Sequence, residues 1–154
     1  ETVVKLLFEN WRRCLKENIN EGAPQTRIVQ TRKELIDLIL MDPNQSISID
    51  GPKGSTKKFG GDEPVELTFD YGEYPMLINP ADGMGWDIIL MPMNNSKDKS
   101  LFPVGHISYR EDYPDRFGND KIILAKHGKY EEEGKTLLDS FFSGLKQFNK
   151  IEWY

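Results

Sequence analysis

A lysine-rich turn follows the first strand-like segment of the sequence. Residues 50–59 read Asp-Gly-Pro-Lys-Gly-Ser-Thr-Lys-Lys-Phe, so three lysines lie in a segment that also contains Gly and Pro. Such a turn can present ammonium groups and backbone N–H groups to a phosphate. The same composition is typical of a solvent-exposed hairpin, and its Gly and Lys spacing is not that of a P-loop. The segment is therefore a candidate phosphate-binding loop, with an ordinary exposed turn as the alternative.

Acidic residues gather near the ends of three other strand-like segments. Asp82 and Asp87 belong to one of them, Glu111 and Asp112 form a pair, and Asp120 ends a Gly-Asn-Asp element. Mg2+ commonly takes one or two carboxylates and completes its shell with water and substrate phosphate. Each segment alone also fits a turn or ordinary surface charge. Together with the lysines, they are the parts of a site for a magnesium-bound polyphosphate.

Every candidate ligand is a hard oxygen donor. The chain has one cysteine and two histidines, and none of them belongs to a group with zinc-ligand spacing. We therefore expect Mg2+ or Mn2+ rather than Zn2+. We expect His106 and His127 to be structural or exposed, and Cys14 to lie in the buried stripe of a helix.

Length and charge narrow the class of protein. The chain has 154 residues, a length at which one domain can bury a sufficient core. Its formal net charge is −5, which disfavours a nucleic-acid partner because binding to phosphate backbones needs a basic surface. No apolar run is long enough to cross a bilayer, and the first residues lack the layout of a signal peptide. The sequence therefore predicts a cytoplasmic globular protein that binds neither nucleic acid nor membrane.

Two helices are predicted before any strand. Apolar residues recur at helical spacing over residues 3–15, and residues 18–27 have the composition of a loop. A second helix is expected to begin at Thr31, which has capping-box spacing to Glu34, and to end at Asp42-Pro43. Residues 1–45 are thus predicted to form an N-terminal helical extension that packs on the same domain.

The remaining residues, 46–154, are predicted to form a mainly β domain. Alternating apolar residues around 47–49 and 65–69, and short apolar runs at 86–91, 101–109 and 121–125, indicate strands. Apolar residues from Leu137 to Phe148 then recur at helical spacing and predict a closing helix. The fold class expected is α+β, mainly β, with an antiparallel sheet or small barrel and helices packed outside it.

Several segments also occur in an order that is typical of one protein family. Residues 52–59 are similar to its turn Pro-Lys-Gly-Ser-x-x-Lys-Tyr, and residues 82–92 to its signature Asp-Gly-Asp-Pro-x-Asp with the following strand. The other matches are Tyr74-Pro75, Pro103-Val104-Gly105, Glu111-Asp112, Gly118-Asn119-Asp120, and a closing helix with Phe141, Phe142 and Lys146. In this order the segments resemble the soluble inorganic pyrophosphatases of the small-barrel type. Residues 1–45 are not covered.

The resemblance implies a closed, OB-like antiparallel β-barrel with flanking helices that hydrolyses pyrophosphate through water activated by several Mg2+ ions. It also implies a role for each matched residue. The metal ligands are Asp82, Asp87 and Asp120, with Glu111 and Asp112 for the ions that arrive with substrate, and Asp50 where the family has glutamate. The substrate ligands are Lys58, Tyr74 and Lys146, and the catalytic residues are Asp87, Asp112 and Lys58.

The chain also departs from the family pattern. Met84 occupies the middle acidic position of the signature, and a thioether cannot accept a proton from the attacking water. No arginine lies between Arg32 and Arg110, so the phosphate-clamping arginine has no counterpart there. In a gap-free alignment Ile122 falls where the family has lysine, and Lys121 points to the other face of the strand. The sequence therefore keeps more of the metal-binding carboxylates than of the substrate contacts.

Two functions remain open at this point. The leading hypothesis is magnesium-dependent hydrolysis of pyrophosphate or a related phosphoanhydride, with reduced or altered activity. The alternative is a catalytically impaired relative that serves as a binding or regulatory module. The expected partner is a small phosphoanhydride, and a homo-oligomer is among the open alternatives.

Overall fold

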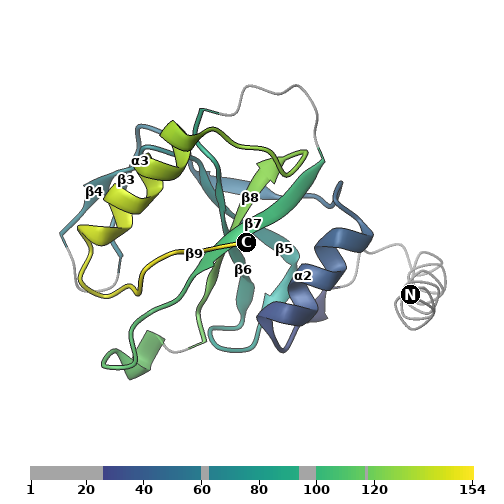
Figure 1. Ribbon diagram of the computed structural model, residues 1–154. Helices are drawn as coiled ribbons and strands as arrows, with labels where there is room; N and C mark the ends of the chain where they lie inside the picture. The colour runs from purple at the N-terminus through teal and green to yellow at the C-terminus, as the bar shows by residue number, and fades with distance from the viewer. Residues whose placement is uncertain (1–25, 60–62, 94–99, 117) are drawn as a thin grey trace, which may run out of the picture.

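A mixed β-sheet organises the chain (Figure 1). The computed structural model describes residues 26–59, 63–93, 100–116 and 118–154, and in these ranges seven strands form one sheet. The strand order is β1-β5-β6-β8-β7-β9, β2 also pairs with β5, and β3 and β4 form a separate hairpin. The bounds are β1 Arg27–Ile28, α2 Arg32–Met41, β2 Ser48–Gly51, β3 Thr56–Lys57, β4 Val65–Glu66, β5 Tyr71–Asn79, β6 Met84–Leu90, β7 Leu101–Ile107, the 3-10 helix η1 Pro114–Arg116, β8 Lys121–Lys126, α3 Glu132–Ser143 and β9 Glu152–Trp153.

The α+β, mainly β class is confirmed, but the expectation of a purely antiparallel sheet is wrong. Strands β5 and β6, β7 and β8, β7 and β9, and β2 and β5 are antiparallel, whereas β1 and β5 and also β6 and β8 are parallel. Strands β6 and β8 are parallel because β8 runs antiparallel to β7 and lies between β7 and β6 in the sheet. Within the described ranges we find no closed barrel, since the ladder of paired strands ends at β1 and at β9.

Helices α2 and α3 cover opposite faces of the sheet (Figure 1). Helix α2 packs Leu35, Leu38 and Ile39 into one apolar cluster with side chains of β5, β6 and β8. Helix α3 and the β3–β4 hairpin pack on the other face, where Phe59 and Phe142 are among the aromatic residues of a second cluster. None of the helices in the described ranges is long and apolar enough to cross a membrane.

The helix predicted from Thr31 is confirmed. The Thr31 hydroxyl accepts a hydrogen bond from the Glu34 backbone N–H at 3.1 Å, and Asp42 caps the other end. The closing helix is shorter than predicted, because α3 ends at Ser143 and Phe148 is buried from the segment that follows. The helix predicted over residues 3–15, with Cys14, lies outside the described residues.

The longest strand, β5, was not predicted from the sequence. Pro75 lies inside it, and proline cannot donate to a strand ladder. The pairing of β5 with β6 is in register from Tyr71 to Tyr74 and shifts before Ile78, so the proline sits in an irregularity where a missing N–H is tolerated. Strand β5 occupies the interior of the sheet and contributes two side chains to the candidate site described next.

Candidate functional site: a mixed-charge pocket at the end of the sheet

The turn between β5 and β6 carries the first part of the site. Gly83, with a φ of 73°, supplies the left-handed residue of this turn, and its N–H donates to the Asn79 carbonyl at 2.8 Å. The Asp82 carboxylate accepts from the Met84 N–H at 2.9 Å. The buried Asn79 amide donates to the Gly118 carbonyl at 3.2 Å, which ties this turn to the loop before β8. The acidic residue of the turn, Asp82, is thereby held beside that loop.

Strand register then aligns three charged side chains in a row. Glu73 of β5 pairs directly with Asp87 of β6, and the parallel register of β6 and β8 places Asp87 level with Lys121. The Lys121 ammonium donates to the Asp87 carboxylate at 2.9 Å. Gly85 makes room for this row, because a Cβ there would lie 2.6 Å from a Glu73 carboxylate oxygen. The row lies on the face of the sheet that α3 and the β3–β4 hairpin cover.

These residues line a pocket of about 210 Å³, which we call the mixed-charge pocket. Its volume is well above the roughly 10–15 Å³ that a single water requires. Four carboxylate and four cationic side chains line it, together with aromatic, thioether and amide groups. The lining residues are Asp50, Lys57, Lys58, Phe59, Tyr71, Glu73, Asp82, Met84, Asp87, Tyr109, Arg116, Asn119 and Lys121.

Lys121 is held more firmly than the other cations. It is 2% exposed, and its ammonium lies 5.3 Å from the ring centres of both Tyr71 and Tyr109. Burial raises the pKa of the Tyr71 hydroxyl well above its ordinary value, and the neighbouring Asp87 carboxylate, which accepts a hydrogen bond from it, raises it further. Asp87 is therefore engaged by an ammonium and a phenol from the protein itself.

The β3–β4 hairpin supplies the more accessible cations. Residues 52–55 form a tight turn, with the Ser55 N–H donating to the Pro52 carbonyl at 3.0 Å and Gly54 at a φ of 93°. The hairpin brings Lys57 over the Tyr71 ring, at 4.4 Å from its centre, and Lys58 to the rim of the pocket. Thus the lysine-rich segment is an exposed turn that connects β2 to β3 and continues into the β3–β4 hairpin, and two of its three lysines also line the pocket.

The carboxylates crowd one side of the pocket. Burial, and then the negative charges of three nearby aspartates, raises the pKa of Glu73 above its ordinary value. Those aspartates are Asp50, Asp87 and Asp82. Like charges so close together favour a cation or a proton between them.

The fit of this pocket to a divalent ion is partial. Within the described ranges, no group of three or more His, Cys, Asp or Glu side chains is placed to hold a metal directly. One or two carboxylates with waters and substrate oxygens are enough for Mg2+, however. The side-chain oxygen of Asn119 is buried at the pocket with no hydrogen-bond partner among the described residues, and it can accept from an ordered water. The donor set thus suits a hydrated Mg2+ rather than a closed metal centre.

Of the predicted site residues, Asp50, Lys58, Asp82 and Asp87 come together in this pocket. Asp120 does not. Asp120 and Lys121 are adjacent in sequence, so their side chains point to opposite faces of the sheet. The Asp120 carboxylate turns toward α2 and forms an ion pair with Arg32 at 2.5 Å. The assignment of Asp120 as a principal metal ligand is therefore not supported by its position.

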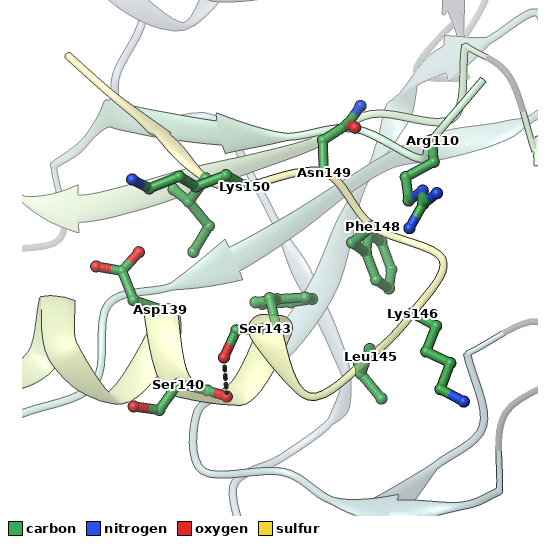
Figure 2. Close-up of a pocket in the computed structure, with 11 residues that line it drawn as sticks. Arg110, Asp139, Ser140, Ser143, Leu145, Lys146, Phe148, Asn149 and Lys150 are labelled. Carbon is green, nitrogen blue, oxygen red and sulfur yellow. Dashed lines mark hydrogen bonds between the residues drawn. The ribbon is translucent and has the colours of Figure 1, made fainter. Parts of the chain in front are cut away.

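Four other predicted residues also lie apart from the pocket. Tyr74 is 2% exposed and packs in the core against α2, where burial raises its hydroxyl pKa, so no substrate reaches it. The Asp112 carboxylate forms a two-point ion pair with Arg110, at 3.0 and 3.1 Å, on an exposed loop that also contains Glu111. Lys146 lines a different cavity beyond the end of α3 (Figure 2). None of these four residues lines the mixed-charge pocket.

Sequence reasoning missed several pocket residues. Glu73 and Tyr71 lie on the strand that was not predicted, so neither was considered. Lys121 was identified as facing away from Ile122, and that orientation brings it to the pocket, because odd-numbered residues of β8 face α3. Arg116 follows Pro114 in a short 3-10 helix and carried no motif. The strand alternation around Lys121 was the one signal that could have found it.

The comparisons with known proteins add no relative. No protein-family model, no curated protein and no solved structure matches the chain. The resemblance to inorganic pyrophosphatases therefore depends on the residues named above, and the function is inferred from the pocket itself.

Proposed function

We propose that the mixed-charge pocket binds a small phosphoanhydride, of which pyrophosphate is the simplest, as its magnesium complex. The observation that carries this proposal is that four carboxylates and four cations line one small pocket. Cationic side chains recognise phosphate oxygens, and carboxylates recognise the metal that such anions carry. A pocket for a bare anion has no need of the carboxylates, and a pocket for a bare cation has no need of the lysines.

Three of the four cations support the anion part of the proposal. Among the described residues, none forms an ion pair with Lys57, Lys58 or Arg116, whereas Lys121 is paired with Asp87. An ammonium or guanidinium without a carboxylate partner is available for a phosphate oxygen. The volume of about 210 Å³ favours an anion with few atoms beyond its phosphates.

The carboxylates support the metal part. When bound, Mg2+ neutralises phosphate oxygens and lowers the pKa of water. Asp82 and Glu73 are the residues best placed to hold it through water, because Asp87 is already paired with Lys121. The Asn119 side-chain oxygen, which has no hydrogen-bond partner in the part of the chain that the structure describes, can accept from the same hydration shell.

Hydrolysis in this pocket is expected to be slow. Met84 at the rim cannot accept a proton, Asp87 is held by Lys121, and Asp112 lies elsewhere with Arg110. These observations also favour the second candidate, a binding module that retains phosphoanhydride and releases no product.

The relation to the pyrophosphatase fold belongs to this proposal as well. The order of matching segments supports it, while the open ladder of strands speaks against a barrel.

Calorimetric titration tests the binding. Pyrophosphate is added with and without Mg2+ to wild type, Lys58→Met and the control Lys53→Met, which removes an exposed lysine of the turn before β3, outside the pocket. We expect saturable binding that Mg2+ strengthens. One charge-assisted hydrogen bond contributes about 1.5–3 kcal/mol, so Lys58→Met should weaken binding roughly 10- to 100-fold. Absence of binding, or equal effects of the two lysine variants, contradicts the proposal.

Phosphate release by the same samples separates the two candidate functions. A hydrolase is supported if phosphate release is slow and depends on magnesium. Asp82→Asn should then reduce the release, and the control Asp37→Asn on α2 should leave it unchanged. Binding without any release supports the binding module.

A further inference from the structure

A second, larger cavity lies between the end of α3 and the segment that leads to β9 (Figure 2). Its volume is about 610 Å³, which is within the range of roughly 300–1,000 Å³ of small-molecule pockets. Four buried apolar side chains contribute to its lining, namely Phe142, Leu145, Phe148 and Ile151. We call it the α3 cavity, and the mixed-charge pocket shares none of its residues.

The charged side chains that line the α3 cavity are predominantly cationic. Arg110, Lys146 and Lys150 line it against a single carboxylate, that of Asp139. The Asp139 carboxylate already accepts a hydrogen bond from the Trp153 indole at 3.1 Å. The lining therefore has a net positive charge, although the formal net charge of the chain is −5. The local charge therefore favours an anion.

The cations differ in how they are held. Asp112 binds two nitrogens of the Arg110 guanidinium, Nε and one Nη, which fixes its plane and leaves the other Nη without a partner among the described residues. In the same ranges, Lys146 and Lys150 form no ion pair, and Figure 2 shows them reaching out on different sides of the cavity. Arg110 is thus an oriented donor, and the two lysines are adaptable ones.

The wall of the cavity is held in place by contacts within the chain. The Arg110 N–H donates to the Gln147 carbonyl at 2.8 Å, and the Asn149 N–H donates to the Ser108 carbonyl at 2.9 Å. The rings of Tyr109 and Phe148 stack with their centres 4.3 Å apart. These contacts fix the segment after α3 against the end of β7, so little ordering is needed when a ligand binds.

We propose that the α3 cavity binds a small organic anion, with a flat apolar body over Phe148 and Leu145 and one acidic group at Arg110 and Lys146. The apolar lining distinguishes this ligand from inorganic phosphate or pyrophosphate, which have nothing to bury there. The cations distinguish it from a neutral or cationic aromatic compound. Because guanidinium binds carboxylate and phosphate alike, the acidic group is of either kind, and the experiment separates them.

The test uses amide and Arg Nε–H NMR resonances of the full chain. Phenyl phosphate and benzoate are titrated separately, with inorganic phosphate and benzyl alcohol as ligands that lack the apolar body or the charge. We expect saturable shifts of residues 145–151 and of the Arg110 Nε–H with at least one of the two aromatic anions, and the tighter of the two identifies the acidic group. Shifts of equal size and midpoint with benzyl alcohol, or none with either anion, overturn the proposal.

Two variants locate the site. Lys146→Glu reverses one cation at the cavity, and Ser143→Trp places a bulky ring at its rim, while Lys53→Glu makes the same charge change away from the cavity. Loss of one charge-assisted contact weakens binding roughly 10- to 100-fold, which is expected for Lys146→Glu and not for Lys53→Glu. Unfolding curves confirm that each variant is folded. Equal weakening by both charge reversals, or full binding in both cavity variants, places the anion elsewhere and contradicts the inference.

Discussion

At the residue scale, Met84 is the side chain that most affects the proposed chemistry. It is 61% exposed at the rim of the mixed-charge pocket, beside the Asp82 carboxylate that binds its N–H. Met84→Asp adds a proton acceptor there. General-base catalysis contributes about 10²- to 10⁴-fold, so magnesium-dependent phosphate release from pyrophosphate should rise by that order. Met93→Asp, an exposed methionine outside the pocket, is the control. If wild type already hydrolyses pyrophosphate efficiently and Met84→Asp lowers that rate, another group is the base.

Lys121 is the residue whose removal should cost most stability. Its ammonium is buried and paired with Asp87, and removing one partner of a buried pair leaves an uncompensated charge. Lys121→Met is expected to lower the free energy of unfolding by roughly 3–5 kcal/mol in urea titrations. The double variant with Asp87→Leu should recover much of that loss, because no charge then remains unpaired. Equal stability of wild type and Lys121→Met is the contrary result.

At the element scale, β9 is attached to β7 through a cluster around His106. The His106 imidazole contacts the Glu152 carboxylate and the Tyr154 hydroxyl, each at 2.8 Å, and Arg32 of α2 and Asp120 before β8 complete the charged groups around it. Burial, and then the Arg32 charge, lowers the pKa of His106, although both carboxylates oppose this effect. The cluster thus joins α2, β7 and β9 around an imidazole whose environment favours the neutral form.

The sign of the pH dependence follows from that lowered pKa. In the unfolded chain His106 takes up a proton near its ordinary value of 6.5, whereas in the folded chain it does so only at lower pH. Its contribution to stability is therefore complete above pH 6.5 and is lost as the pH falls from there through the folded pKa. Urea unfolding between pH 7.5 and 5 should show this slope in wild type and in His127→Gln. His106→Gln should flatten the pH dependence of the free energy of unfolding. If the slope persists in His106→Gln, other groups are responsible for it.

At the scale of the whole molecule, the Glu73 carboxylate of the mixed-charge pocket opposes folding at neutral pH. Because burial and the adjacent aspartates raise the pKa of Glu73, the stabilising contribution is present below its ordinary value of 4.5 and is lost as the pH rises through the raised pKa. Glu73→Gln should therefore raise the melting temperature at pH 7, whereas Glu63→Gln, on an exposed side chain, should not. If both variants melt like wild type, the repulsion is not significant.

A bound cation should relieve the same repulsion. Mg2+ at ten times its Kd stabilises the folded state by about 1.4 kcal/mol, which raises the melting temperature of a chain of this size by roughly 3–6 °C. Sodium chloride at equal ionic strength controls for screening, and Asp82→Asn should reduce the rise. An equal rise with both salts excludes a specific ion.

Local sequence signals determined the elements that depend on neighbours along the chain. The cap at Thr31 and the stop at Asp42-Pro43 predicted α2, because capping and proline act within one helical turn. The alternating and apolar runs predicted most of the longer strands. Four pocket residues, Asp50, Lys58, Asp82 and Asp87, were also predicted from turn and strand-end motifs, since a hairpin holds neighbours in sequence close in space.

Only the tertiary structure decided which charges meet. Asp120 and Lys121 are adjacent in sequence, yet strand alternation sends one to Arg32 and the other to Asp87, and the insertion of β8 between β6 and β7 decides the partner. Glu73 faces Asp87 only because β5 forms despite Pro75, through an irregular register that no local pattern indicates. Ion pairs between distant segments depend on strand order and register, which are set by the packing of both faces of the sheet and not by the residues that carry the charge.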